Sequence, residues 1–149
     1  MKKSQQVVGR NDLLEIYTDG ASRGNPGKGS GGFVFLVNGS VIYRDAQYFG
    51  DITNNQAEYR ALQCALDVAL EYTRWRIKIY SDSQIMINQL NKQWRIKDQA
   101  LKYLYRQTMF ASLAFESVEY LHVSRNNPYI SEADRLCNSC LDEKLGLGL

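Results

Sequence analysis

The chain has little of what would place its 149 residues in an unusual class of protein. Two prolines exclude a proline-rich or collagen-like chain. No apolar run approaches the ~18–20 residues that cross a bilayer, so we expect no membrane partner. Lys2 and Lys3 stand near the start, but no apolar block follows them, and a secretory signal is therefore not predicted.

Cysteine, histidine and net charge are also sparse. Three cysteines, an odd number, do not suggest a disulfide framework, which favours an intracellular, cytoplasmic protein. Cys137 and Cys140 alone cannot complete a zinc site, so we interpret them as packing residues. We interpret the single histidine, His122, as an ordinary strand residue. A net charge of +2 is too small to indicate nucleic-acid binding by composition alone.

What the chain does have is the composition of an ordinary globular domain, with 44% hydrophobic and 23% charged residues. Its length fits one domain, for which we expect a monomer. We place this domain at residues 13–144, after a flexible leader at residues 1–12 and before a frayed tail at residues 145–149.

Apolar alternation and turn signals predict three strands at the start, the second and third joined by a hairpin at Asn38-Gly39. The glycine-rich stretch from Gly20 to Gly32 is predicted to be a loop. Later segments alternate between helical and strand periods. The expected strands are 13–18, 32–37, 40–43, 76–80 and 118–123, and the expected helices are 55–73, 83–90, 98–114 and 131–144. This order predicts an α/β fold with a five-stranded mixed sheet, three antiparallel strands and then parallel additions, flanked by helices.

Four acidic residues fall at the ends of these elements. Asp19 and Asp82 follow the first and fourth strands, whereas Glu58 and Asp134 lie in the first turns of the first and last helices. In open α/β sheets, sites form where strands end and helices start, so the four carboxylates could meet there. Each acid also has a local interpretation: Glu58 and Asp134 fit capping boxes, Asp82 fits a helix cap and Asp19 fits a turn.

If the carboxylates do meet, they repel one another, and a hard divalent cation removes this conflict. Mg²⁺ prefers carboxylate oxygen and water, while the scarcity of histidine and cysteine argues against zinc. Two such ions about 3.5–4 Å apart can clamp the attacking and leaving oxygens of a phosphoryl displacement.

Four segments resemble, in order, the signatures of type 1 ribonuclease H. They are YTDGASRGNPG at 17–27, TNNQAEYRAL at 53–62, YSDSQ at 80–84 and SEADRL at 131–136. The resemblance covers about residues 13–141 and implies the ribonuclease H-like fold. It also implies an endoribonuclease that hydrolyses the RNA strand of RNA–DNA hybrids with two Mg²⁺ ions, Mn²⁺ often substituting, and leaves 5′-phosphate and 3′-hydroxyl ends. The implied catalytic metal ligands are Asp19, Glu58, Asp82 and Asp134.

The resemblance further implies substrate contacts. A protein finds an RNA strand by its 2′-hydroxyls, and the residues implied to approach them are Gly20, Ser22, Asn25 and Glu58. The residues implied to contact the minor groove are Asn54, Asn55 and Gln84, and the residue implied to hold a DNA-strand phosphate is Thr53. Helix capping is the alternative role of the Asn and Thr residues.

The sequence departs from many family members in the loop before the last acid. Residues 123–130 contain no histidine and look short, as in archaeal and some bacterial members. In other members, that histidine aids proton transfer and product release. We expect Arg125, Asn126 or Asn127 to take over part of this role.

A second departure lies at residues 91–98, where many members insert a basic, tryptophan-rich helix and loop. We expect a reduced grip on the DNA strand, with stacking by tryptophan and cations on phosphate. Its residues would be Lys92, Trp94, Arg95 and Lys97. The alternative is a solvated turn with Trp94 packed beneath it.

Two other functions stay open from the sequence. One is a non-catalytic module that binds hybrids or duplex RNA, and the other is a different nuclease of the same fold, such as a transposase or junction resolvase. A binding module gains nothing from clustering acids against phosphates, so the four carboxylates favour catalysis. Whether double-stranded RNA is also a substrate is left open by the missing histidine and insertion.

Overall fold

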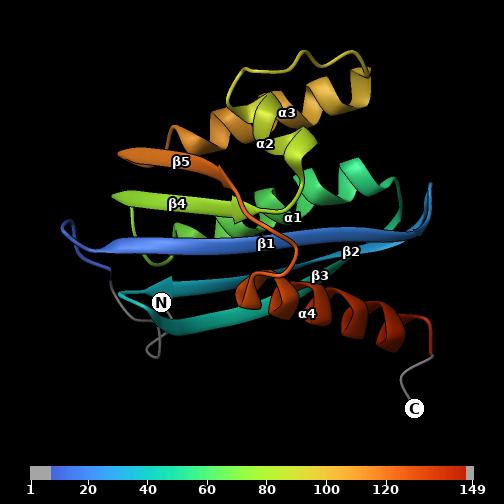
Figure 1. The fold of residues 1–149 in the computed structure, drawn as a ribbon, viewed down its shortest axis with the longest axis horizontal. Coiled ribbons are helices and arrows are strands. Elements are labelled where there is room, and N and C mark those ends of the chain that lie inside the picture. The colour runs from blue at the N-terminus through green and yellow to red at the C-terminus, as the bar shows by residue number, and fades with distance from the viewer. Residues whose placement is uncertain (1–7, 147–149) are drawn as a thin grey trace.

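One five-stranded mixed sheet organises the computed structural model, which describes residues 8–146 (Figure 1). The strand order is β3-β2-β1-β4-β5, with β1–β3 antiparallel and β4 and β5 parallel to β1. The strands are β1 Leu13–Gly24, β2 Gly27–Val37, β3 Ser40–Ile52, β4 Arg76–Ser81 and β5 Ser117–His122. The helices are α1 Asn54–Ala69, α2 Gln84–Leu90, α3 Gln99–Ser112 and α4 Pro128–Lys144. The predicted fold class and element order are therefore confirmed.

The two faces of the sheet carry separate apolar cores, because successive side chains of a strand point to opposite faces. On one face, Ile16 and Phe35 belong to the larger cluster, which includes the buried side of α1 and reaches α3. On the other face, Tyr17 and Val34 pack with Ile130 of α4. Figure 1 shows β1 at the centre of the sheet, with α4 alongside the β1–β3 half and α3 beyond β4 and β5.

The glycine-rich stretch predicted as a loop is a β-hairpin, and that prediction is wrong. β1 and β2 pair continuously from Leu14–Val37 to Gly24–Gly27, around a tight turn with a cis Asn25–Pro26 bond. At Gly20, Gly31 and Gly32 a helix approaches the strands closely: a Cβ on Gly32, for example, would overlap the carbonyl oxygen of Ala133 in α4. These three glycines therefore permit packing and do not interrupt the strands, whereas Gly24 adopts a positive φ at the turn.

The described ends of the chain contact the domain. Within the expected leader, Val8 is 2% exposed, and its N–H donates to the carbonyl oxygen of Tyr72 at 3.0 Å. At the other end, Leu145 N–H donates to the Leu141 carbonyl at 2.9 Å. The remainder of the expected leader and tail, 1–7 and 147–149, lies outside the described residues. Between residues 8 and 146, none of the helices has the length and apolar character required to span a membrane.

Candidate active site

The three helices that begin next to the predicted acids, α1, α2 and α4, are capped by neutral residues. Thr53 begins α1 with a capping box, in which its hydroxyl accepts from Gln56 N–H and the Gln56 side chain accepts from Thr53 N–H. Ser83 caps α2, and its hydroxyl accepts from Met86 N–H. Asn127 caps α4, with a proline at the first helical position, so this helix begins before the predicted start.

The capping roles considered for the acids are therefore wrong. Glu58 and Asp134 lie beyond the capping positions of their helices, and Asp82 precedes the residue that caps α2. Asp19 is not in a turn but inside β1, where it pairs with Gly32 of β2. All four carboxylates are thus left available for other contacts.

Three of the acids form a compact cluster. One carboxylate oxygen each from Asp19 of β1, Glu58 of α1 and Asp82 after β4 lies within 4.8 Å of the others. The N–H of Gly20 donates to Glu58 Oε1 at 2.9 Å, which ties α1 to β1 beside the cluster. The adjoining cavity of about 390 Å³ is lined by Asp19, Gly20, Ala21, Asn54, Asn55, Glu58, Asp82, Arg125, Ile130, Ser131 and Asp134.

Burial and mutual repulsion make ionisation of this cluster unfavourable. The pKa of Asp19 is raised to about 8, first by burial and then by the charge of Asp82 and by contact with Asp134. Burial also raises the pKa of Glu58, and the charges of Asp19 and Asp82 act in the same direction. A divalent cation would relieve this repulsion, and an all-oxygen donor set suits Mg²⁺. The residues present therefore fit a magnesium centre.

Asp134 stands slightly apart from the other three acids. It lines the same cavity and is hydrogen-bonded to Asp19, but it is exposed and does not belong to the three-carboxylate cluster. The side-chain amide of Asn138, one turn later in α4, donates to Asp134 Oδ1 at 3.2 Å. Asn138 was not predicted from the sequence, although its i,i+4 spacing from Asp134 is a signal that could have found it.

The three residues expected to replace the loop histidine lie in different surroundings. Arg125 Nε is 3.5 Å from Asp82 Oδ2, and its side chain is 91% exposed over the cavity. Asn127 Oδ1 accepts the N–H groups of two residues at the start of α4. Asn126 is exposed, and its N–H donates to Ser124. His122 is the exposed last residue of β5.

Most residues expected to contact substrate gather where the β1–β2 hairpin meets the start of α1. Ser22 N–H donates to Asn54 Oδ1 at 2.9 Å, and Asn54 N–H donates to Asn25 Oδ1 at 3.1 Å. Asn55 lines the acidic cavity, whereas Gln84 is exposed in the first turn of α2. The hairpin and the helix therefore present a row of polar groups next to the acids.

A second surface, which we call the basic groove, lies between residues 91–98 and α3. Its volume is about 420 Å³, and its lining residues are Gln89, Lys92, Gln93, Trp94, Arg95, Ile96, Lys102, Tyr105 and Arg106. Trp94 is 48% exposed, and Lys97 is not among the lining residues. The contribution of α3 was missed, although Lys102 and Arg106 are spaced i,i+4 and so share one helix face.

The sheet order, the helices on its faces and the acidic cluster formed by Asp19 within β1, Glu58 of α1 and Asp82 after β4 define a ribonuclease H-like domain. A family model described as "Reverse transcriptase-like" matches residues 17–140. Ribonuclease HI of Halobacterium salinarum is 34% identical over 135 residues, 90% of this chain and 67% of that protein. The chain belongs to the ribonuclease H family, and Asp19, Glu58 and Asp82 form its candidate acidic metal site.

Solved structures agree with this assignment. The crystal structure of RNase H1 from Halobacterium salinarum aligns with a TM-score of 0.83 at 34% identity, covering 88% of this chain and 98% of that chain. LC11-RNase H1, crystallised in complex with an RNA/DNA hybrid, aligns with a TM-score of 0.81 at 28% identity, covering 89% and 99%. The bifunctional protein Rv2228c of Mycobacterium tuberculosis is 36% identical over 130 residues, 85% of this chain, but the matched region is 35% of that longer protein.

Proposed function

We propose that this protein is an endoribonuclease that hydrolyses the RNA strand of RNA–DNA hybrids and leaves 5′-phosphate and 3′-hydroxyl ends. The observation that carries the proposal is the cluster of Asp19, Glu58 and Asp82, whose oxygens lie within 4.8 Å. Such a cluster repels phosphate unless cations accompany it, so it suits catalysis better than simple binding. The RNA/DNA hybrid in the complex of LC11-RNase H1 supports the choice of substrate.

Two Mg²⁺ ions, with Mn²⁺ as a substitute, are the proposed cofactors. Asp19, Glu58 and Asp82 would hold them, with Asp134 completing the set from α4. When bound to these residues, the ions would supply activation of the attacking water and stabilisation of the leaving 3′ oxygen. The protein contributes part of this geometry, because Gly20 N–H holds Glu58 and Asp19 lies within β1.

Neighbouring residues would orient the hybrid. The hydrogen-bonded group of Ser22, Asn25 and Asn54 would meet the 2′-hydroxyls and the minor groove beside the acids. Arg125 is the one residue of the expected proton-transfer loop that contacts the acidic cluster, through Asp82. We assign Arg125 to pairing with the oxygens of the scissile phosphate, since an arginine can pair with phosphate oxygens.

The three cysteines are unpaired thiols, which fits a reducing compartment, and we propose that the enzyme acts in the cytoplasm as a monomer.

Cleavage of matched substrates tests the proposal. We expect the wild-type chain to cut the RNA strand of a hybrid with Mg²⁺ or Mn²⁺ and to be inert in EDTA, while a DNA duplex stays intact. A double-stranded RNA arm determines whether the specificity extends to RNA duplexes. Asp82→Asn should lower cleavage by about 100-fold or more with the fold retained, because it removes a charged ligand. Asp67→Asn, an exposed acid of α1, is the matched control. An uncut hybrid, or cleavage that survives Asp82→Asn, would contradict the proposal.

A further inference from the structure

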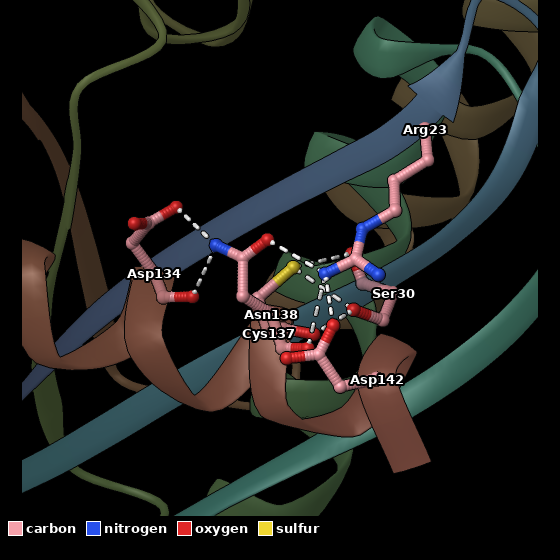
Figure 2. Close-up of polar contacts among 6 residues, drawn as sticks. All are labelled: Arg23, Ser30, Asp134, Cys137, Asn138 and Asp142. Atoms are coloured by element: carbon pink, nitrogen blue, oxygen red, sulfur yellow. Dashed lines mark hydrogen bonds and ion pairs between the residues drawn. The ribbon is translucent and has the colours of Figure 1, made fainter. Parts of the chain in front are cut away.

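Asp134 is the exposed member of the four acids and lies on the last helix, so its side chain must be held in one orientation by its neighbours. An exposed carboxylate has several accessible rotamers, and a metal ligand must hold one of them. The side-chain nitrogen of Asn138 donates both to Asp134 Oδ1, at 3.2 Å, and to the Asp134 carbonyl, at 3.0 Å (Figure 2). One amide group thus donates hydrogen bonds to both the backbone and the carboxylate of Asp134.

The orientation of this amide is itself determined. Arg23 Nη2 at the end of β1 donates to Asn138 Oδ1 at 3.4 Å and to the Asn138 carbonyl at 3.3 Å. It also pairs with Asp142 Oδ1 at 2.7 Å. Because a guanidinium can only donate, the oxygen of the amide must face Arg23 and its NH₂ group must face Asp134. Figure 2 shows this succession from Asp142 and Arg23 through Asn138 to Asp134.

The helix turn that carries Asn138 is fixed against the sheet. Ser30 of β2, which is fully buried, donates from its hydroxyl to the carbonyl oxygen of Cys137 at 2.7 Å. Cys137 is also fully buried, and its thiol contacts the same serine (Figure 2). The backbone of α4 at this turn therefore has a defined position relative to β1 and β2.

We propose that Asn138 is a positioning residue for Asp134, and that Arg23, anchored by Asp142, holds the Asn138 amide in the productive orientation. The inference rests on the proposed function, since it assigns a task within that reaction. Arg23 follows Ser22 in the hairpin that we expect to meet the RNA strand. The same hairpin that contacts substrate therefore also holds the fourth carboxylate in place.

Steady-state cleavage of the hybrid separates positioning from binding. Asn138→Ala should lower kcat by about 10–100-fold, the usual effect of losing a group that orients a ligand, with KM changed less than about twofold. Its melting temperature should stay close to that of the wild type, because alanine favours a helix more than asparagine does. Ser139→Ala, at the exposed neighbouring position of α4, is the matched control and should leave kcat unchanged. A kcat of Asn138→Ala within twofold of wild type would overturn the proposal.

A double-mutant cycle tests the role of Arg23. If Arg23 acts through Asn138, Arg23→Ala should lower kcat, and the double variant should be no slower than Asn138→Ala alone. Additive losses, or a rise in KM with kcat unchanged, would instead mean that Arg23 contacts the hybrid directly and would remove it from the proposed arrangement.

Nuclear magnetic resonance provides a readout that does not depend on cleavage. The side-chain ¹⁵N–¹H pair of Asn138, identified by its loss in Asn138→Ala, should move in Arg23→Ala and in Asp134→Ala but not in Ser139→Ala. An unchanged pair in both of the first two variants would overturn the proposal. If the wild type fails to cut any hybrid, the proposed function fails, whereas these resonances still decide whether the amide is held as described.

Discussion

Asp19 lowers the stability of the folded chain in the absence of metal. Asp19 is 7% exposed and lies close to other acids, so burial and their charges raise the pKa of its carboxyl to about 8 in the folded chain, against 3.8 for the ordinary group. As the pH rises from about 4 to 8, the unfolded chain releases this proton while the folded chain retains it. The folded state without metal therefore loses stability over this interval.

Replacing Asp19 should remove this loss. In EDTA at pH 8, we expect Asp19→Asn to unfold at a higher temperature than the wild type, with a gain of about 1–3 kcal/mol in the free energy of unfolding. At pH 5 the gain should be smaller, because folded Asp19 is then protonated and neutral. Thermal denaturation followed by circular dichroism at both pH values measures the difference.

The same experiment includes two controls. Asp67→Asn, at an exposed position, should not reproduce the pH-dependent gain. Mg²⁺ should raise the melting temperature of the wild type more than that of Asp19→Asn, because an ion that binds the folded chain stabilises it. Identical pH dependence of wild type and Asp19→Asn would contradict the assigned cause.

At the scale of elements, the site depends on how closely α1 approaches β1. A Cβ on Gly20 would overlap the carbonyl of Ala57, and the Gly20 N–H also holds the carboxylate of Glu58. From the family resemblance, Gly20 is expected to approach the 2′-hydroxyls of the substrate, but the packing against Ala57 already requires glycine at this position. Helix α1 can deliver Glu58 to the acidic cluster because no side chain separates it from the strand.

We therefore expect Gly20→Ala to destabilise the fold by about 2–3 kcal/mol, since an added methyl meets backbone that cannot move aside. Its residual cleavage should fall further than its stability explains, because Glu58 is displaced with the helix. Gly50→Ala is the comparison: its φ of +75° is strained for alanine, but nothing lies within 4 Å of the added carbon. It should cost about 1 kcal/mol and leave cleavage intact. Urea denaturation and cleavage of the folded fraction measure both effects, and equal losses would contradict the packing argument.

The elements also show what sequence patterns can and cannot predict. The strand and helix order followed from apolar periods, and the four acids were found because each was predicted to lie beside an element end, although Asp19 proves to lie inside β1. The antiparallel pairing of the first two strands was predicted, but the continuation of both strands through Gly20–Gly32 was missed. Glycine is typical both of turns and of close approaches to another element, and the approaching helices are distant in sequence. The caps were misassigned by a few residues for a related reason: Thr53 and Asn127 compete with neighbouring polar residues, and backbone geometry decides between them.

At the scale of the whole molecule, the acidic cavity and the basic groove are two surfaces of opposite charge. Aspartates and a glutamate line the first, while Lys92, Arg95, Lys102 and Arg106 line the second beside Trp94. A hybrid has two backbones, and its phosphates favour cationic surfaces. The cavity would receive the RNA strand with its cations, and the groove would hold the DNA strand without any metal.

This division predicts how binding depends on salt. In EDTA, where no cleavage occurs, we expect the logarithm of hybrid affinity to fall linearly with the logarithm of salt concentration. Arg95→Ala and Lys102→Ala should each reduce that slope by about 1, because each removes a phosphate contact and the counterion release that accompanies it. Trp94→Ala should weaken binding by about 1–3 kcal/mol with little change of slope, since stacking is not ionic.

Arg74→Ala, which removes an exposed cation before β4 at the other end of the strands, should change neither the affinity nor the slope. Fluorescence anisotropy of a labelled hybrid at several salt concentrations measures all four variants, and an unchanged slope for Arg95→Ala and Lys102→Ala would show that the DNA strand lies elsewhere.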